Sequence, residues 1–395
     1  MTANPRATEP VGAVVVGGDY QGLGIVRSLG RHGIPVYVID DERSIARYSR
    51  YTRDAVRVPD LRDEQRTIDV LLEFARRKSL RGWVLFPTRD ELVAAFSRHK
   101  AQLSEYYAVP TPDWDAVRWA WDKRNTYRLA QELGIPAPRT WYARDLEELD
   151  RIDAEFPIAL KPAIKDHFVY ATKAKAWRAD SHAELRDLYK RAAALVDPAE
   201  ILIQELIPGD GRQQFAYGAF FKNQRPIGSM VVRRRRQHPP EFGRASTYVE
   251  TVDLPVLERY SERFLEAINY YGLVELEYKL DPRDKQYKLL DVNARTWGYH
   301  TLGLSAGVDF PYLLFKDQLG QAVEPSRAKV GISWIRLLTD LPTGVAEIWG
   351  KRLDWRSYVR SILSCDTEAV FSPEDPLPGI AELILLPYLM VTRGY

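Results

Sequence analysis

Residues 272–298 read GLVELEYKLDPRDKQYKLLDVNARTWG, with polar and apolar side chains alternating on both sides of a polar turn. This alternation predicts two strands joined at DPRDK, because successive side chains of a strand point to opposite faces. Residues two apart then share a face of their strand. If the two strands pair as a hairpin, one region gathers a set of polar side chains: Glu275, Glu277, Asp291, Asn293 and Arg295.

The polar face of this hairpin predicts a metal site. Carboxylate and amide oxygens are hard ligands that suit Mg²⁺, which also binds substrate phosphates. Arg295 lies on the same face and suits a phosphoryl oxygen. The alternative is an exposed hairpin with cross-strand ion pairs. That alternative leaves the polar residues inside the apolar flanks of LLDVNAR unexplained, so the metal hypothesis is favoured.

Two lysines upstream of the hairpin are candidate anion ligands. In WDKRNTYRLAQELGIPAPRTW, Asp122 can cap a helix that Gly134 ends. Lys123 occupies the first turn of that helix, where its charge opposes the helix dipole, so it either binds an anion or is simply solvated. In FPIALKPAIKDHF an apolar strand ends at Lys161, which predicts a phosphate ligand in a cleft.

The segment after Lys161 is basic. It carries Lys165, His167, Lys173 and Lys175, which predicts either a mobile flap over anions or a solvated charge run. Further on, EILIQELIPGDG (residues 200–211) reads as an apolar strand followed by a polar hinge and a turn. By composition alone this stretch predicts no chemistry.

The N-terminal stretch VVVGGDYQGLG (residues 14–24) resembles the start of a nucleotide-binding unit, and the next strand, PVYVIDD, ends in Asp40 and Asp41. A dinucleotide fingerprint requires an acidic residue at the end of this second strand, but it also requires the glycine pattern Gly-x-Gly-x-x-Gly. The position two after Gly17 is Asp19, whose carboxylate would repel a pyrophosphate. An NAD-dependent oxidoreductase is therefore disfavoured, and a glycine turn opening an α/β unit is favoured.

The first ~115 residues predict an α/β unit with a mostly parallel sheet. GWVLFPT supplies a third strand, and TRDE predicts a capping box with Thr88 as N-cap and Glu91 three residues later. VPTPDWD then reads as a proline-marked linker.

Length and composition bound the remaining possibilities. The 395 residues predict two or three domains, and the net charge of +2 gives no reason to expect nucleic acid as a partner. A single cysteine, Cys365, excludes an intrachain disulfide and fits a cytoplasmic location. No run reaches the ~18 apolar residues of a membrane span. Near the C-terminus, LILLPYLMV contains Pro387 and predicts a buried packing segment.

The hairpin, the two lysine segments and QELIPGD occur together and in one order, and over roughly residues 12–320 they resemble the ATP-grasp superfamily of carboxylate–amine ligases. The similarity is to its D-aspartate-ligase-like and carbamoyl-phosphate-synthase-like branch. It implies a fold of α/β and α+β type in three parts. These are an N-terminal Rossmann-like pre-ATP-grasp domain over 1–115, a two-lobed ATP-grasp domain over 116–325 with lobes at about 116–203 and 204–325, and a small C-terminal extension over 326–395.

The resemblance also implies roles for single residues. ATP phosphates would be bound by Lys123 and Lys161, and the adenine edge by the backbone of Glu205, Leu206 and Ile207, with Asp210 as a weaker ribose candidate. Mg²⁺ or Mn²⁺ would be held by Glu277, Asp291 and Asn293, with Glu275 as a less favoured ligand. Arg295 would contact the γ-phosphate or an acyl phosphate. The family often has a glycine-rich flap after its strand lysine, whereas AIKDHFVYATKAK has no glycine.

The chemistry implied is phosphorylation of a substrate carboxylate by ATP, followed by attack of an amine on the acyl phosphate to give an amide, ADP and phosphate. The stretch VVRRRRQHPPEFGRASTYVET (residues 231–251) is the expected acceptor segment. On a regular strand, Arg233 and Arg235 face one way and Arg234 and Arg236 the other. One pair is therefore expected to bind the acyl phosphate or an acidic substrate, and a surface basic run is the alternative. Arg233 and Arg235 are carried forward as catalytic candidates, and Glu250 as a further contact.

The glycine turn acquires a different role under this resemblance. Backbone amides around Gly18 and the following helix N-terminus would face the cleft and bind a substrate carboxylate. Asp19 and Tyr20 would contact the substrate, with Asp19 facing its amine. The expected partners are thus a small carboxylate and a small amine.

Three other functions stay open at this point: a kinase-like phosphotransferase on the same fold, the oxidoreductase, and a non-enzymatic ATP-binding module. Family members are often dimers, so a homodimer is one expected state. After residue ~325, Trp334, Trp349 and Trp355 have helical apolar spacing and are expected to pack in the interior.

Overall fold

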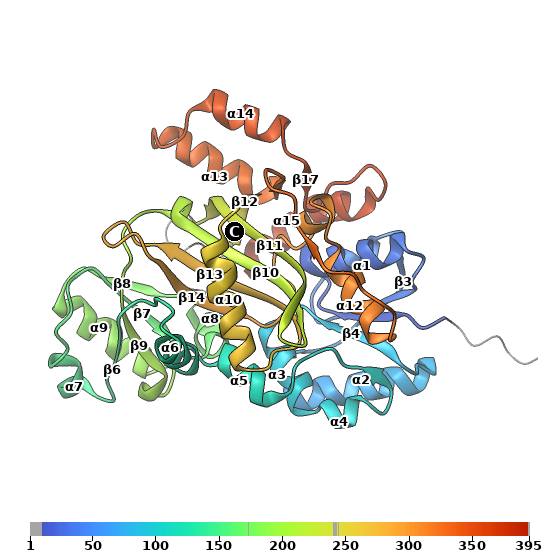
Figure 1. Cartoon of the computed structure of the whole chain (residues 1–395), viewed down its shortest axis with the longest axis horizontal. Coiled ribbons are helices and arrows are strands. Elements are labelled where there is room, and N and C mark those ends of the chain that lie inside the picture. Colours follow the sequence, from blue (N-terminus) through green and yellow to red (C-terminus); the bar gives the residue numbers. More distant parts are fainter. Residues whose placement is uncertain (1–9, 173, 240–242, 244, 394–395) are drawn as a thin grey trace, which may run out of the picture.

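The computed structural model describes residues 10–393 except 173, 240–242 and 244. These residues form a mixed α/β fold with three sheets and helices on their faces (Figure 1). No helix of the described part is long and apolar enough to cross a membrane.

The first sheet is parallel and has the order β3-β2-β1-β4-β5. Helix α1 (Tyr20–Arg31) packs on one face of this sheet, and α2 (Glu64–Lys78) and α3 (Asp90–Arg98) pack on the other. Burial on both faces explains the continuous apolar runs of its central strands. The strands are β1 (Ala13–Val16), β2 (Val36–Asp40), β3 (Thr52–Arg57), β4 (Trp83–Pro87) and β5 (Tyr107–Ala108).

Two sequence expectations change in this sheet. Strand β3 was not expected, because as an edge strand of sequence TRDAVR it is only partly buried and has no apolar run. Thr88 does not cap α3, so the expected capping box is wrong: Arg89 holds the N-cap position without a side-chain cap. The Thr88 hydroxyl instead donates to the carbonyl of Val16 at 3.0 Å, which ties the ends of β1 and β4 together.

The second sheet is antiparallel, with the order β6-β9-β7-β8. Helix α5 (Trp114–Trp121) and then α6 (Lys123–Glu132) lead into it, and Asp122 caps α6 as predicted by accepting from the Arg124 amide. Gly134 follows the helix end with φ of +61°, also as predicted. The other elements are β6 (Thr140–Tyr142), α7 (Leu146–Asp150), β7 (Ile158–Pro162), α8 (Lys165–Thr172), β8 (Trp177–Ala179), α9 (His182–Ala193) and β9 (Ile201–Glu205).

The third sheet has eight strands in the order β14-β13-β10-β11-β12-β16-β17, with β15 paired to β11. The predicted hairpin is present as β13 (Gly272–Leu280) and β14 (Tyr287–Asn293), which pair antiparallel. Helix α10 (Pro255–Ala267) covers the face of Val274 and Leu276 (Figure 1). Because strand side chains alternate, Glu275 and Glu277 point to the opposite face. The remaining strands are β10 (Gln214–Lys222), β11 (Arg225–His238), β12 (Ala245–Thr251), β15 (Ser326–Arg327), β16 (Ser333–Ile335) and β17 (Thr367–Glu368).

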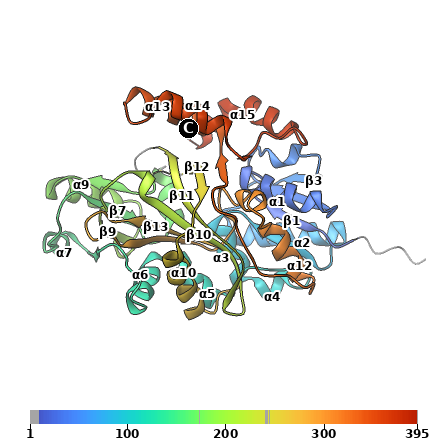
Figure 2. The ribbon, with the colours of Figure 1, turned by 45° about the horizontal axis from the view of Figure 1, so that its top comes forward.

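The C-terminal part is joined to both halves of the molecule. Strands β16 and β17 extend the third sheet. Arg27 of α1 donates to the buried Asp375 at 3.0 Å, and within the C-terminal part Arg336 pairs with the buried Glu382 at 2.8 Å. Its helices are α13 (Leu337–Trp349), α14 (Trp355–Leu363) and α15 (Leu377–Arg393) (Figures 1 and 2). Helices α11 (Leu302–Ser305) and α12 (Phe310–Gln318) precede this part. One further short helix, α4, spans Lys100–Leu103.

Two expectations about this part are wrong. Trp334 is buried as expected, but the side chains of Trp349 and Trp355 are 85% and 57% exposed. The segment around Pro387 is not a buried packing segment either, because Ile384 in it is 73% exposed. The physical reason is that α13, α14 and α15 each pack on the rest of the molecule through one side only. The apolar side chains on their outer sides therefore stay in solvent.

Candidate active site

A cavity of about 530 Å³ lies between the carboxyl ends of the parallel strands and the third sheet. Ligand sites in α/β proteins commonly form at this edge of a parallel sheet. One wall comes from the segments after β1, β2, β3 and β4, a second from α8 and the chain after it, and a third from the third sheet. The charged lining residues are Asp19, Asp41, Glu42, Arg62, Arg89, Lys165, Lys175, Arg234, Glu275, Glu277 and Arg295.

The polar face of the hairpin forms as the sequence predicts. Glu275 lies opposite Asn293, and Glu277 lies opposite Asp291. The amide nitrogen of Asn293 donates to Glu275 Oε2 at 2.9 Å and to Glu277 Oε1 at 3.1 Å. Directly opposite residues of an antiparallel pair share a face, so the two carboxylates, the amide and Asp291 meet in one place.

The two glutamates of the hairpin have opposite pKa shifts. Burial alone would raise the pKa of Glu277, but the charges of Arg234 and Lys175 hold it at about 2. Burial and the charge of Glu277 raise the pKa of Glu275 to about 7, although the Tyr299 hydroxyl donates to this carboxyl group. Two carboxylates this close repel each other when both are ionised. Glu277 therefore stays ionised at neutral pH, while Glu275 is near its titration point.

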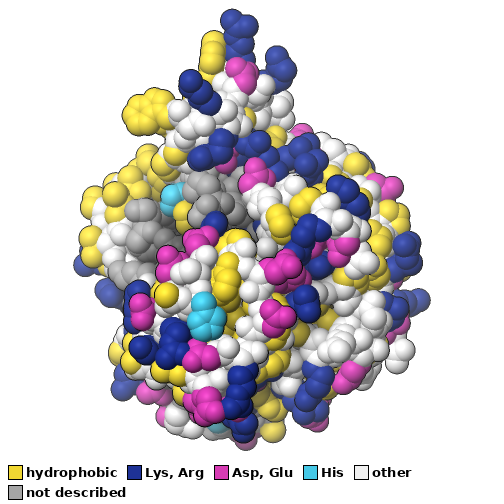
Figure 3. Space-filling view, turned by 90° about the vertical axis from the view of Figure 1, so that its left-hand side faces the viewer, with side chains coloured by type: hydrophobic (Ala, Val, Ile, Leu, Met, Phe, Trp, Pro, Cys, Tyr) yellow, Lys and Arg dark blue, Asp and Glu magenta, His cyan; other side chains and the backbone are white. Residues whose placement is uncertain are grey.

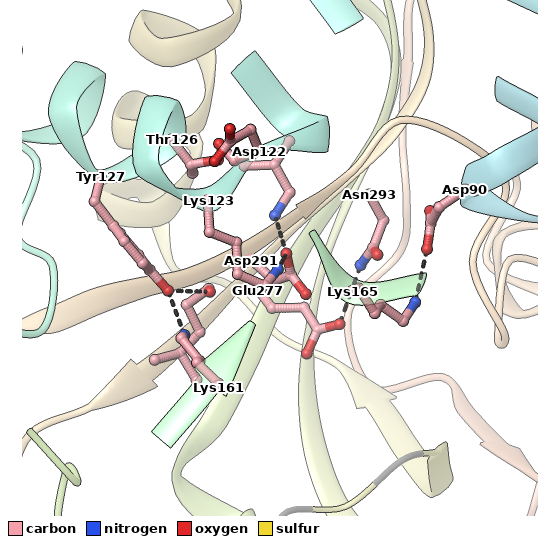
Figure 4. A network of polar contacts seen from close by, with 12 residues as sticks. Asp90, Asp122, Lys123, Thr126, Tyr127, Lys161, Lys165, Glu277, Asp291 and Asn293 are labelled. Carbon is pink, nitrogen blue, oxygen red and sulfur yellow. Dashed lines mark hydrogen bonds and ion pairs between the residues drawn. The ribbon is translucent and has the colours of Figure 1, made fainter. Parts of the chain in front are cut away.

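Two of the acidic groups of the hairpin face basic groups of the chain. Arg234 lies 3.2 Å from Glu277, and Lys123 forms an ion pair with Asp291. Lys161 donates to the Tyr127 hydroxyl at 2.5 Å, and burial lowers the pKa of Lys161 to about 8. Figure 4 shows lysines from three elements arranged around the two strands of the hairpin. The predicted lysines and the predicted metal residues are therefore neighbours in space.

Asp90 is a site residue that the sequence analysis missed. Its carboxylate accepts from Arg295 at 2.7 and 3.1 Å and from Lys165 at 2.6 Å. Burial would raise the pKa of Asp90, but the charges of Arg295 and Lys165 hold it far below its usual range. Asp90 follows the buried strand β4 at the cavity edge. Its place after a parallel strand is the one sequence signal that could have indicated it.

The predicted flap is a helix in the structure, α8, rather than a loop. Lys165 at its start binds Asp90, and the Tyr170 hydroxyl donates to Glu91 at 2.6 Å, so α8 bridges from the second sheet to α3. His167 does not face the cavity but pairs with Glu200 at 2.7 Å. Lys175 does line the cavity, whereas Lys173 lies outside the described residues.

The pairing expected for the four arginines is wrong. The register of β11 and β12 slips between Arg234 and Arg236, so the face alternation breaks at Arg235. Arg234 alone of the four lines the cavity. Arg236 instead holds the buried Asp340 through two bonds of 2.8 and 2.9 Å.

The two arginines named as catalytic candidates lie outside the cavity lining. Arg233 donates to the backbone carbonyl of Arg212 at 3.1 Å. Arg235 pairs with Glu250 at 2.5 Å, which also places Glu250 away from the cavity. A run of four identical residues does not show where a β-bulge falls. The sequence therefore contained no sign that Arg234, rather than Arg233 or Arg235, would line the cavity.

The backbone amides of the glycine turn are used within the chain. Gly18 N–H donates to Asp40 at 2.6 Å, and the Asp19 carboxylate accepts from the amides of Gln21 and Gly22 at 3.0 and 3.3 Å. The amides of Gly18, Gln21 and Gly22 are therefore bonded to the chain's own carboxylates, and capture of a substrate carboxylate at this turn stays a prediction. Asp19 and Tyr20 do line the cavity, as predicted.

The predicted hinge is partly engaged in protein contacts. The Glu205 amide donates to Arg139 O at 2.9 Å, and its side chain pairs with Arg283 at 2.9 Å. The Ile207 carbonyl accepts from Lys279 at 2.8 Å. Asp210 caps a short turn by accepting from the Arg212 amide at 2.9 Å. Adenine contacts of Glu205, Leu206 and Ile207, and a ribose contact of Asp210, stay predictions.

The donor set of the hairpin suits magnesium by its chemistry. Within the described ranges, no group of three or more His, Cys, Asp and Glu side chains is placed to hold a metal. The candidate set is of another kind, with the carboxylates of Glu277 and Asp291 opposite each other and the amide of Asn293 bonded to Glu277. Carboxylate and amide oxygens beside basic side chains suit a Mg²⁺ ion that also binds the phosphates of a substrate.

Comparisons with known proteins agree with this arrangement. Residues 222–337 match a family described as "ATP-grasp in the biosynthetic pathway with Ter operon". A D-aspartate ligase of Enterococcus faecium is 25% identical over 304 residues, which is 71% of this chain and 70% of that protein. The C-terminal section of the carbamoyl phosphate synthase large chain of Methanopyrus kandleri is 27% identical over 201 residues, covering 46% of this chain and 34% of that protein.

A solved structure is similar to this chain at the level of the fold. The L-amino acid ligase of Bacillus licheniformis superposes with a TM-score of 0.63 at 15% identity, over 80% of this chain and 76% of that chain.

Proposed function

We propose that this chain is a member of the ATP-grasp superfamily and an ATP- and Mg²⁺-dependent ligase that joins a carboxylate to an amine and releases ADP and phosphate. The observation that carries the proposal is the hairpin face of Glu277, Asp291 and Asn293 next to Lys123 and Lys161. This combination exceeds what nucleotide binding alone requires, which disfavours a non-enzymatic module.

We assign the three parts of the chain on the same basis. Residues 1–115, with the parallel sheet, would be a Rossmann-like pre-ATP-grasp domain. Residues 116–325 would be the ATP-grasp domain, with its lobes built on the second sheet (116–203) and on the third sheet (204–325). Residues 326–395 would be an extension, although β16 and β17 continue the third sheet.

In this mechanism Lys123 and Lys161 bind the phosphates of ATP, and Arg295 holds the γ-phosphoryl group as it moves to the carboxylate. Bound by Glu277, Asp291 and Asn293, Mg²⁺ would neutralise phosphate charge. Because phosphoryl transfer needs mainly positioning and electrostatic stabilisation, no protein nucleophile is required. The carboxylate oxygen attacks the γ-phosphorus, and ADP leaves. The amine nitrogen then attacks the acyl carbon, phosphate leaves, and the amine loses its proton.

The substrate class that fits the cavity is an amino acid. Its wall carries carboxylates at Asp19 and Glu42 and guanidinium groups at Arg62 and Arg234. Groups of both signs in one cavity suit a zwitterion with an ammonium and a carboxylate. Two of the similar proteins are named as ligases of amino acids, which supports the same class.

The test is a screen for ADP release with amino acids offered in pairs, as acid and as amine. A ligase forms ADP and phosphate only when both substrates are present, and mass spectrometry then finds the amide. ADP formation without an amine, together with a stable phosphorylated product, would assign the phosphotransferase alternative. No ADP with any pair, although ATP binds, would assign a binding module.

The shifted pKa of Lys161 predicts a pH dependence of ATP use. Below about pH 8 its ammonium group is charged and available to a phosphate, and above that pH it is neutral. If the charged form is required, the KM for ATP rises by about tenfold per pH unit above this pKa. We expect this rise in initial rates of ADP formation measured from about pH 7 to pH 9.5.

A matched variant separates this effect from other titrations. Lys161→Arg keeps its charge throughout that range, so its KM profile should stay flat above pH 8 even if its turnover is lower. A wild-type KM that does not change with pH would show that Lys161 does not bind the phosphates.

The corrected arginine assignment gives a second expected result. Arg234→Gln should lower kcat at least about tenfold, because this side chain reaches Glu277 and lines the cavity. Arg235→Gln should change kcat less than about twofold, because its ion pair with Glu250 is partly exposed and lies outside the cavity lining. Steady-state kinetics of the two variants measures the difference. Equal losses would contradict a special role for Arg234.

A further inference from the structure

The α13–α14 hairpin, residues 337–363, has apolar stripes on its outside. Leu341, Val345 and Trp349 are spaced by four along α13, and their side chains are 47%, 47% and 85% exposed. In α14 the same spacing gives a second exposed stripe: Trp355, Val359 and Leu363 at 57%, 43% and 82%. Residues four apart lie on one face of a helix, so each helix presents a continuous apolar strip to solvent.

The inner side of the hairpin is firmly packed against the rest of the molecule. The outer stripes are therefore a surface feature and do not belong to the hydrophobic core. Arg236 of the third sheet holds the buried Asp340 of α13 with two bonds. The ring of Tyr358 fills the space over Gly344, where an added Cβ would lie 2.3 Å from the ring. Its hydroxyl donates to the Asp340 carbonyl at 3.3 Å. These contacts fix which faces of α13 and α14 point outward.

The hairpin also concentrates positive charge. The exposed charged residues between 341 and 364 are Lys351, Arg352, Arg356 and Arg360, with Asp354 as the single acid. Asp354 caps α14 by accepting from the Ser357 amide at 2.9 Å. The chain as a whole has a formal net charge of only +2, so this segment is unusually basic.

Shape, apolarity and charge coincide at the tip of the hairpin. Trp349 ends α13 and Trp355 begins α14, so both indoles flank the turn that contains Lys351 and Arg352. The hairpin projects from the body of the molecule, and its surface mixes apolar and basic side chains (Figures 1 and 3). Exposed apolar patches of this kind mark sites of interaction.

We propose that the α13–α14 hairpin docks on an anionic membrane surface. Tryptophan is favoured at the interface between lipid and water, and helices with Trp and Leu on one face and Lys and Arg beside it lie in that interface. The indoles of Trp349 and Trp355 enter the headgroup region, and the four cations face lipid phosphates. The inference rests on the hairpin alone and does not depend on the reaction proposed above.

A second copy of the chain fits this patch less well. In a twofold contact the same patch meets itself, so four cations would face four cations across the interface. Such a contact would bury the apolar stripes, but the like charges juxtaposed at the interface would oppose it. An anionic surface satisfies both the stripes and the charges.

The experiment is flotation of the full-length chain with lipid vesicles. One set is phosphatidylcholine alone, and the other is an equal mixture of phosphatidylcholine and phosphatidylglycerol. Wild type should float with the mixed vesicles, should float weakly or not at all with the neutral ones, and should be released by added salt. The double variant R356Q/R360Q should lower the partition coefficient about thirtyfold. The double variant W349S/W355S should not float.

A control removes two other large exposed apolar side chains, with Tyr142→Ser and Leu195→Ser, which are 49% and 48% exposed in wild type. This control should float like wild type. Retained ADP formation in every variant shows that each is folded. If none of the variants catalyses, circular dichroism and thermal melting serve as the same check.

Several results would overturn the proposal. Binding of wild type to neither vesicle, or equally to both, removes the anionic membrane as the partner. Unchanged flotation of W349S/W355S places any binding elsewhere on the chain. A fall from dimer to monomer mass in W349S/W355S by light scattering, with no vesicle binding by wild type, assigns the hairpin to a second copy instead.

Discussion

Glu277→Gln will lower the rate of Mg²⁺-dependent ADP formation at least about a hundredfold, because Glu277 is a proposed metal ligand. Loss of a residue that only hydrogen-bonds to a metal ligand already lowers metal affinity or activity about 10–100-fold. The carboxylate is held ionised, with a pKa of about 2, and lies within 3.1 Å of the Asn293 amide. Glutamine keeps the size of the side chain but not its charge. Initial rates of ADP formation, measured over a range of Mg²⁺ concentrations, check this result.

Glu262→Gln is the matched control for this prediction. Glu262 lies on α10, on the opposite side of the third sheet, where it accepts from the Tyr217 hydroxyl at 3.2 Å. Its replacement should leave the rate and its Mg²⁺ dependence as in wild type. Asn293→Ala and Asp291→Ala should resemble Glu277→Gln. Mg²⁺-dependent ADP formation that is unchanged in any of these three would remove that residue from the proposed metal site.

Arg295→Lys should lower kcat by about a thousandfold, the lower end of what an arginine at a transferring phosphoryl group contributes. Arg295 uses its planar fork to bond both oxygens of Asp90 while it faces the cavity. A lysine carries the same charge but cannot make the two parallel bonds that fix its direction. Single-turnover measurements of ADP formation separate this loss from slow product release.

Asp90→Asn tests whether Asp90 acts through Arg295. Asparagine can still accept one bond, so Arg295 remains in place but is less firmly directed. We expect a fall in kcat with little change in the KM for ATP, and a smaller loss than in Arg295→Lys. If Asp90→Asn melts at a much lower temperature with an unchanged kcat, Asp90 has a structural role only.

The residues that the sequence placed correctly belong to regular local patterns. Alternation placed Glu275, Glu277 and Asn293 on one hairpin face, because a strand repeats every two residues wherever it pairs without interruption. The Asp122 cap and the turn at Gly134 depend on a few consecutive residues.

The same local arguments failed where distant partners intervened. Arg234 lines the cavity in place of the expected Arg233 and Arg235, because a register shift between β11 and β12 changes which arginine points inward. The amide of Gly18 donates to Asp40, which lies 22 residues away. Trp349 and Trp355 have the spacing of core residues, yet the fold offers them no partner surface. In each case the outcome depends on what another segment supplies.

The sequence by itself therefore determined the two hairpin strands, both ends of α6 and the set of carboxylate, amide and lysine side chains, because these follow from backbone periodicity and local hydrogen bonding. Only the tertiary structure decided which charges meet: Asp90 with Arg295, Lys123 with Asp291, and Arg234 with Glu277. Such pairs join residues that are 43 to 205 positions apart. Their attraction acts over a few ångströms in space, irrespective of separation along the chain.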